Sequence, residues 1–255
     1  MGILNVTPDS FSDGGRWLDR DQALRHAMEM AEAGADIIDI GGESTRPGSR
    51  AVEAQQEIDR VIPLIEAIVA GTDLPVSIDT SKPEVMEAAV RAGAGMINDV
   101  SALRGEGALE TAASLGVPVC LVHMLGSPRN MQIDPEFGDV VGEVQDFLLK
   151  RASQCEAAGI PASDIIIDPG FGFGKTLQHN IDLFKAIPVF AATAYPVLIG
   201  VSRKSMLGQI TGKTVDQRLA ASLATAVLAA QAGASILRVH DVAETVDALK
   251  IAAIL

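Results

Sequence analysis

Four segments of the chain repeat one plan, and this repeat limits the possible folds more than any other feature. They read EAGADIIDIGGES, RAGAGMINDVSA, AAGIPASDIIIDPGFG and QAGASILRVHDV. In each, a helical pattern ends in Gly, a short apolar run follows, and polar residues come next. Gly is common just past a helix end, because it adopts a left-handed backbone at little cost. The apolar runs do not alternate with polar residues, which is typical of parallel strands covered on both faces.

The same rhythm runs through the whole chain and predicts eight strand–helix units. The predicted strands are residues 2–5, 36–40, 75–79, 96–100, 118–123, 164–168, 197–201 and 236–239. Eight such units in about 250 residues are typical of a (β/α)₈ barrel. We therefore predict an α/β fold with a single (β/α)₈ TIM barrel domain over residues 1–255, since no Pro/Ser-rich linker interrupts the rhythm. A doubly wound open sheet is the alternative, but it needs no eighth strand, and no GxGxxG turn follows the first strand.

Composition and charge narrow the classes of partner. The formal net charge of −13 over 255 residues, with no basic stripe to offset it, disfavours nucleic acid or an anionic membrane surface. No run reaches the roughly 18 apolar residues of a membrane span. Cys120 and Cys155 have no metal-like or redox-like spacing, so we expect two reduced structural thiols and a cytoplasmic protein. Small-molecule substrates remain as the expected partners.

A polar or ionisable side chain ends every predicted strand. These side chains are Asn5, Asp39, Asp79, Asn98, Asp99, His123, Asp168, Ser202, Arg203, Lys204, Arg238 and His240. A single Asp at a strand end is often a helix cap, but capping does not explain eight of eight strands. Active sites of this barrel form at the C-terminal ends of the strands. The sequence therefore predicts an active site at that mouth, without naming the reaction.

The residue types at the mouth suggest two kinds of ligand. Asp79, Asn98 and Asp168 suit a flat heterocycle rich in N–H donors, because a carboxylate accepts two donors at once. Cations and amides on the other side suit phosphate; they are Asn5, Arg46, Arg238 and His240. No zinc-like Cys/His spacing and no GxSxG motif is present. Lys204 could form a Schiff base, but its neighbours Ser202 and Arg203 favour anion binding at a helix N-terminus.

Eight segments resemble, in order, the signature segments of the dihydropteroate synthase family. They read MGILNVTPDSFSDGG, DIGGESTRPGS, SIDTSKPEV, INDVSA, HMLGSPRNMQ, DPGFGFGK, GVSRKSMLG and LRVHDV. The resemblance covers essentially the whole chain and implies a (β/α)₈ barrel. It implies a transferase of folate biosynthesis that joins 6-hydroxymethyl-7,8-dihydropterin diphosphate to p-aminobenzoate, giving 7,8-dihydropteroate and diphosphate. It also implies a sulfonamide target and a homodimer.

The resemblance assigns roles residue by residue. The implied pterin pocket is Asp79, Asn98, Val122, Asp168, Phe173 and Lys204. The implied diphosphate pocket is Asn5, Arg46, Arg238 and His240, with Asn5 as the protein ligand of Mg²⁺. The implied catalytic set is Asp79, Lys204, Arg238 and His240. Many relatives carry Met where Val122 stands, so we expect slightly looser packing on the pterin. His123 is expected to be structural and is not placed in the catalytic set.

The family reacts by a dissociative displacement, and the resemblance implies that two loops close over the bound substrate. The loops carry the motifs NVTPDSFSDGG and GGESTRPG, and the implied p-aminobenzoate contacts are Phe11, Thr45, Pro47 and Ser202. Glu43 and Asp39 are expected to orient their loop rather than to touch substrate.

Two alternatives share part of this pattern. The pterin-binding barrel of corrinoid-dependent methyltransferases has the same Asp/Asn pocket but no use for ESTRPG or SRKSMLG. A pterin-binding module without catalysis would be expected to lose Asn5, Arg46 or His240, and all three are present. Diphosphate release with and without p-aminobenzoate separates these readings.

Overall fold

The structure is a computed structural model that describes the chain except for residues 7–14, 45–47, 50, 128–130 and 132–133. Four predicted site residues therefore lie outside the described residues: Phe11, Thr45, Arg46 and Pro47. Among the helices of the described part, none is long and apolar enough to cross a membrane.

Eight strands of the described chain form a closed ring. They are β1 (Gly2–Asn5), β2 (Ile38–Gly41), β3 (Val76–Asp79), β4 (Met96–Asp99), β5 (Val119–Val122), β6 (Ile165–Asp168), β7 (Leu198–Ile199) and β8 (Ile236–Leu237). Strands β1 to β6 form one parallel sheet in chain order, and β7 pairs with β8. Single parallel bridges, Ile167 to Val197 and Gly2 to Val239, join this pair to β6 and to β1. The predicted barrel is confirmed, and the open-sheet alternative is wrong.

The predicted strand ends agree with the observed ones to within two residues. The largest differences are at β7 and β8. The sequence predicts five residues for β7 and four for β8, and each strand has two. Val197 and Val239 lie just outside these strands and make only isolated bridges. β7 and β8 pair with each other over two residues, and each meets its other neighbour, β6 or β1, at a single bridge.

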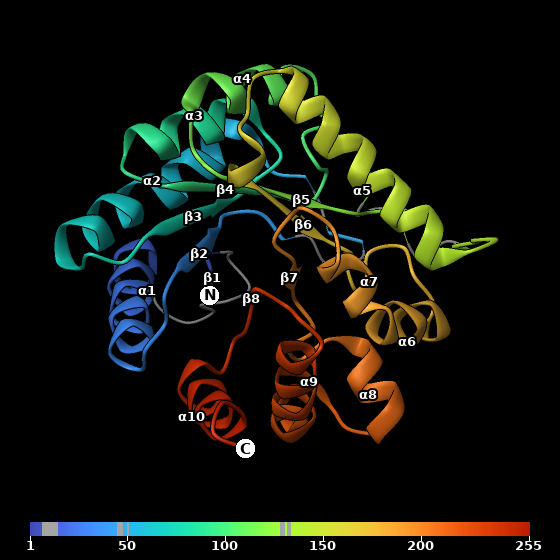
Figure 1. Ribbon diagram of the computed structural model, residues 1–255. Coiled ribbons are helices and arrows are strands. Elements are labelled where there is room, and N and C mark those ends of the chain that lie inside the picture. Colours follow the sequence, from blue (N-terminus) through green and yellow to red (C-terminus); the bar gives the residue numbers. More distant parts are fainter. Residues whose placement is uncertain (7–14, 45–47, 50, 128–130, 132–133) are drawn as a thin grey trace.

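Helices cover the outside of the ring (Figure 1). They are α1 (Gly15–Glu32), α2 (Ala54–Gly71), α3 (Pro83–Arg91), α4 (Ala108–Leu115), α5 (Val140–Ala157), α6 (Leu177–Lys185), α7 (Ile187–Ala191), α8 (Ser205–Thr211), α9 (Leu219–Gln231) and α10 (Val242–Ala252). The chain passes around the ring in order, from α1 beside β1 to α10 below β8 (Figure 1). Each strand end therefore opens onto the same mouth.

The glycine of each repeated segment ends a helix in the way that the sequence predicts. Gly34, Gly93, Gly159 and Gly233 all have left-handed backbones, with φ between 94° and 109°. At Gly93 the backbone N–H donates to the Val90 carbonyl, and the next residue donates to the Ala89 carbonyl. This paired pattern satisfies the last carbonyls of the helix and turns the chain into the next strand. In each repeated segment, the glycine therefore marks where the chain leaves a helix and turns toward the next strand of the barrel.

Alternation along each strand sorts side chains between two cores. Outward residues such as Ile38, Ile78 and Ile97 pack under the helices. Inward residues form a lower apolar layer inside the barrel, which includes Met96, Cys120, Ile166 and Leu198. Above that layer, toward the mouth, the inward positions become polar. Both cysteines are free and buried, as predicted.

Candidate active site

A row of residues runs across the first four strands at the mouth. In the parallel register Asn5 pairs with Gly41, Gly41 with Asp79, and Asp79 with Asn98. Gly41 has no side chain, and a Cβ there would lie 3.6 Å from both Asn5 Oδ1 and the Asp79 Cβ. The glycine therefore leaves the space between the amide and the carboxylate open. On the other side of the barrel, Val122 and Asp168 pair in register.

Arg238 joins two carboxylates at the centre of the site. Its Nε donates to Asp39 Oδ2 at 2.6 Å, and its Nη2 donates to Asp79 Oδ2 at 2.8 Å. Asn98 Nδ2 also donates to Asp39 Oδ2, at 3.2 Å. Asp39 is fully buried, whereas the side chain of Asp79 is 15% exposed toward the mouth. Asp39 thus contacts the guanidinium of Arg238 on its buried side, and Asp79 contacts it on the side nearer the mouth.

The shared guanidinium leaves this centre short of positive charge. Burial raises the pKa of Asp79 to about 7, although Arg238 opposes the rise. Burial lowers the pKa of Arg238, but Asp39 and Asp79 outweigh burial, so that its pKa is raised. Asp39 Oδ1 and Asn98 Oδ1 are buried without a hydrogen-bond partner among the described atoms. Buried acceptors without a partner are suited to a ligand that brings N–H donors.

Lys204, Phe173 and Asp168 form the opposite wall. Lys204 Nζ lies 4.5 Å from the centroid of the Phe173 ring and donates to the Phe171 carbonyl. Asp168 Oδ1 accepts from the Gly170 N–H at 2.7 Å. Burial lowers the pKa of Lys204 to about 8, against the attraction of Asp168, and burial raises the pKa of Asp168. This wall brings together an aromatic ring, a cation and a carboxylate, which are three residues of the implied pterin pocket.

A buried lysine that the sequence analysis missed supports this wall. Lys175 Nζ contacts His123 Nδ1 at 2.9 Å, the Gly170 carbonyl at 2.9 Å and the Phe173 carbonyl at 3.1 Å. Burial lowers the pKa of His123 to about 3, so that the neutral ring can accept the hydrogen bond. His123 is thus bonded within the fold, in agreement with its expected structural role. The Lys at the end of the DPGFGFGK motif was the one signal that pointed to this contact.

His240 and Ser202 lie together beside the last strand. The Ser202 hydroxyl accepts from the His240 backbone N–H at 3.2 Å and lies 3.1 Å from His240 Nδ1. Burial lowers the pKa of His240 to about 4, and the charges of Arg203 and Arg238 lower it further. Ser202 lies three residues before the first residue of α8, so it precedes that helix rather than belonging to its first turn. The ring of His240 is therefore neutral at pH 7 and bonded to Ser202.

The described residues offer few side chains that could bind a metal ion. No group of three or more His, Cys, Asp or Glu side chains in the described part is arranged to hold a metal ion. Asn5 Oδ1 is an oxygen donor at the mouth, close to Asp79. Mg²⁺ prefers oxygen ligands and commonly binds through one protein ligand and substrate phosphates. The donors among the described residues fit such an arrangement.

Comparison with known proteins places the chain in a family. Residues 1–240 match the family described as Pterin binding enzyme. The chain is 51% identical over 251 residues to dihydropteroate synthase of Escherichia coli K12, covering 98% of this chain and 89% of that protein.

Two solved structures are similar throughout the chain. Yersinia pestis dihydropteroate synthase with a sulfonamide drug complex has a TM-score of 0.95 and 50% identity, and the match covers 100% of this chain and 92% of that one. Xanthomonas albilineans dihydropteroate synthase in complex with 7,8-dihydropteroate has a TM-score of 0.89 and 52% identity, over 98% and 90% of the two chains. The chain therefore belongs to the pterin-binding enzymes, in the dihydropteroate synthase family.

Proposed function

We propose that this protein is a dihydropteroate synthase, with the whole chain as one pterin-binding barrel domain. It would join 6-hydroxymethyl-7,8-dihydropterin diphosphate to p-aminobenzoate, as a transferase of folate biosynthesis that forms a C–N bond. The observation that carries this proposal is the pairing of Asp39 and Asp79 through Arg238 at the barrel mouth, facing the wall of Asp168, Phe173 and Lys204. This arrangement offers acceptors for a pterin and cations for diphosphate in one opening.

The pterin would bind between the two walls of the mouth. Asp168 has one carboxylate oxygen that is not used by Gly170, and it can accept N–H donors of the 2-amino-4-oxo ring. Asn98 Oδ1 is a second buried acceptor. Phe173 and Val122 would pack against the ring, and Lys204 would donate to a ring carbonyl or nitrogen.

Diphosphate would bind on the side of Asn5, Arg238 and His240, together with Arg46. Arg238 contacts Asp79, so the two proposed pockets share this one guanidinium. Asn5 would be the protein ligand of Mg²⁺, whose chemistry is to neutralise charge on the departing diphosphate. His240, neutral and partly buried, would donate a hydrogen bond to a phosphate oxygen without adding a charge.

The chemistry needs little from a general base. An aryl amine is already neutral at pH 7, so the costly event is breaking the bond between the pterin methylene and diphosphate. Cleavage leaves cationic character on the methylene, which a carboxylate such as Asp79 stabilises when it is ionised. Arg238 and His240 would stabilise the departing diphosphate on the other side. This is stabilisation of charges that develop in the transition state, without a covalent enzyme intermediate.

The p-aminobenzoate contacts are predicted from sequence alone for three residues. Phe11, Thr45 and Pro47 lie outside the described residues. Ser202 is described, and its hydroxyl is bonded to His240. A carboxylate of p-aminobenzoate would have to accept from the hydroxyl or from a neighbouring backbone N–H. Ser202 is therefore proposed as a contact that links the p-aminobenzoate and diphosphate sides.

Turnover tests this function directly. Purified protein is incubated with dihydropterin diphosphate and Mg²⁺, with and without p-aminobenzoate, and diphosphate and dihydropteroate are quantified. We expect equal amounts of both products when p-aminobenzoate is present. Asp168→Asn should lower kcat/KM at least about a hundredfold, whereas Asp182→Asn on the exposed face of α6 should not change it. Binding of the pterin without any turnover would leave a non-catalytic module, and methyl transfer would favour the corrinoid-dependent class.

Two further properties belong to this proposal. Leu219 and Leu228 on α9 and Ile251 on α10 are large exposed apolar side chains. We propose that these helices form a homodimer interface, which light scattering of the purified protein tests. The two buried free thiols favour a reducing, cytoplasmic environment.

A further inference from the structure

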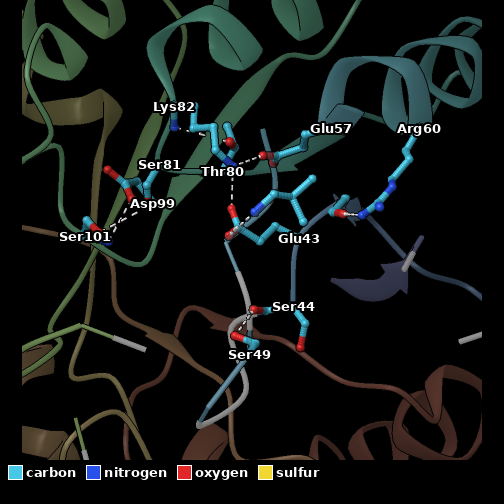
Figure 2. Close-up of polar contacts among 12 residues, drawn as sticks. Glu43, Ser44, Ser49, Glu57, Arg60, Thr80, Ser81, Lys82, Asp99 and Ser101 are labelled. Atoms are coloured by element: carbon cyan, nitrogen blue, oxygen red, sulfur yellow. Dashed lines mark hydrogen bonds and ion pairs between the residues drawn. The ribbon is translucent and has the colours of Figure 1, made fainter. Parts of the chain in front are cut away.

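A buried carboxylate on α2 faces a lysine of the next strand–helix turn. Glu57 has no exposed side-chain surface, and its Oε2 pairs with Lys82 Nζ (Figure 2). A buried charge is stable only when it is paired and hydrogen-bonded. Glu57 Oε1 has no hydrogen-bond partner among the described atoms. The whole charge of Glu57 therefore depends on Lys82.

Lys82 also holds a second carboxylate, which belongs to the segment 41–52. Its Nζ pairs with Glu43 Oε2, and Glu43 Oε1 accepts from the Val52 N–H at 3.1 Å (Figure 2). Glu43 thus ties the start of this segment to its end. The Ser49 hydroxyl, which donates to the Ser44 carbonyl at 2.5 Å, closes the same base. The residues predicted to hold p-aminobenzoate, Thr45 and Pro47, stand between these two ties in the sequence.

The start of the segment presses against Glu57 itself. A Cβ at Gly42 would lie 2.9 Å from Glu57 Cγ and 2.8 Å from Val61 Cγ1, closer than packed atoms normally approach. Arg60 Nη1 donates to the Gly42 carbonyl at 2.7 Å (Figure 2). The backbone at Gly42 is therefore fixed on α2, and a shift of Glu57 would move it.

Lys82 comes from a rigid turn that begins at a proposed pterin contact. It lies three residues after Asp79 and precedes the first residue of α3. The turn is held by Asp99, which accepts from the Ser81 hydroxyl and from the Ser101 N–H (Figure 2). Asp99 also accepts from the Leu103 N–H at 2.7 Å. Lys82 thus connects the strand end that carries Asp79 to the segment that carries the p-aminobenzoate residues.

We propose that Lys82 is a positioning residue for the second substrate: its ammonium, held between Glu57 and Glu43, sets the base of segment 41–52 relative to the pterin pocket. This inference rests on the proposed function. Burial lowers the pKa of Lys82, but the hydrogen bonds and charges of Glu43 and Glu57 outweigh burial and raise it. The ammonium is therefore charged across the neutral range.

Removal of the ammonium should affect the two substrates differently. In Lys82→Met, two carboxylates face each other without a cation, and Glu43 is pushed outward with the base of the segment. We expect the KM for p-aminobenzoate to rise about tenfold or more, the size usual for a lost charged hydrogen bond. Affinity for the pterin diphosphate should stay within about twofold to threefold, because Asp79 and Asp168 are not moved.

Glu43→Gln is the sharper variant, because Glu43 is partly exposed and its loss leaves Glu57 paired. It should raise the same KM about threefold to fivefold with little change in the free energy of unfolding. Both changes break the same contact, in which Lys82 pairs with Glu43 and Glu57. The double variant should therefore raise the KM less than the product of the two single effects. Lys82→Arg should recover part of the loss. Arg91→Met, which breaks an exposed ion pair on α3, is the matched control and should leave both substrates unaffected.

Two outcomes overturn the proposal. A normal KM for p-aminobenzoate in Glu43→Gln, with Lys82→Met changing only the free energy of unfolding, would make the lysine a structural partner of Glu57 alone. Equal loss of affinity for both substrates in Lys82→Met would show a general collapse of the mouth. Wild-type turnover is measured first, so absence of dihydropteroate formation there would instead contradict the proposed function.

Discussion

At the scale of single residues, Asp79 is held in a position that costs the protein stability. Its carboxyl shares Arg238 with Asp39, and burial raises its pKa to about 7. A carboxyl whose pKa is higher in the folded state than its unfolded value of 3.8 favours folding below pH 3.8 relative to higher pH. That relative stability is lost as the pH rises through about 7. An ionised Asp79 at pH 8 therefore destabilises the unliganded fold.

The first prediction follows from the raised pKa of Asp79 in the folded state. Asp79→Asn should raise the free energy of unfolding of the unliganded protein by roughly 1–2 kcal/mol at pH 8 and by little at pH 4. The same variant should lose most of its pterin affinity. Urea unfolding at the two pH values measures the difference, with Asp182→Asn as an exposed control. An equal gain at both pH values would show that ionisation of Asp79 is not the cause.

Arg238 gives the second prediction. Lys in its place keeps one charge but cannot bridge two carboxylates as a planar guanidinium does. Arg238→Lys should weaken diphosphate binding more than tenfold and pterin binding only a few-fold, because Asp168 and Asn98 still hold the ring. Calorimetry with each ligand separately measures both affinities. Equal losses would place Arg238 in the pterin pocket rather than between the two.

At the scale of elements, the turn between β6 and α6 depends on one buried lysine. Four acceptors surround Lys175 Nζ: His123 Nδ1 and the carbonyls of His123, Gly170 and Phe173. Burial lowers the pKa of Lys175. An ammonium nevertheless offers three N–H donors to these acceptors, whereas a neutral amine offers two and would aim its lone pair at one of them. We therefore expect a charged lysine that organises this turn.

The third prediction is that Lys175→Met destabilises the protein by about 3 kcal/mol, because several buried carbonyls lose their donor. Pterin affinity should fall as well, since Phe173 and Asp168 flank the same turn. Urea unfolding gives the stability, and the nitrogen chemical shifts of His123 report the loss of its Nδ1 partner. An unchanged His123 signal would contradict the contact.

Sequence reasoning could predict elements that are encoded locally. The helix-ending glycines at 34, 93, 159 and 233 define their own turns, so strands after them were placed within two residues. Strand-end side chains such as Asp168 could be predicted because a polar residue ends each apolar run. The partners of Arg238 and Lys175 could not be predicted, because they come from strands and turns far apart in sequence that only barrel closure brings together. The division of the sixth helical unit into α6 and α7 at Ala186, with Pro188 in the first turn of α7, was also missed.

At the scale of the whole molecule, the ring is not equally strong all round. Strands β1 to β6 are paired over three or four residues, whereas β8 meets β1 through the single bridge between Gly2 and Val239. Ile3 N–H donates to the Val239 carbonyl at 2.9 Å, and Val239 N–H donates to the Met1 carbonyl at 3.0 Å. The joint between β8 and β1 is the narrowest of the described ring, together with that between β6 and β7.

The fourth prediction concerns this joint. Amides that close it should exchange with solvent earlier than those of β3, β4 and β5, because local opening is easiest where few hydrogen bonds must break. Hydrogen exchange of the unliganded protein, followed by mass spectrometry, resolves the two regions. Earlier exchange in β3 to β5 would show that the joint is stabilised by packing rather than limited by its hydrogen bonds.

The central claim is that one barrel mouth assembles both substrate sites, with the first substrate completing the site of the second. Segments 5–15 and 41–52 each carry a predicted diphosphate ligand, Asn5 or Arg46, and predicted p-aminobenzoate contacts. Binding of Mg²⁺ and diphosphate would therefore favour the arrangement that p-aminobenzoate needs, and the coupling must be reciprocal.

Equilibrium binding of labelled p-aminobenzoate, with and without pterin and Mg·diphosphate, tests this claim most directly. We predict almost no binding to the protein alone and measurable binding when both other ligands are present. Diphosphate should in turn bind more tightly when p-aminobenzoate is added. Tight binding of p-aminobenzoate to the bare protein, unchanged by the other ligands, would contradict the account.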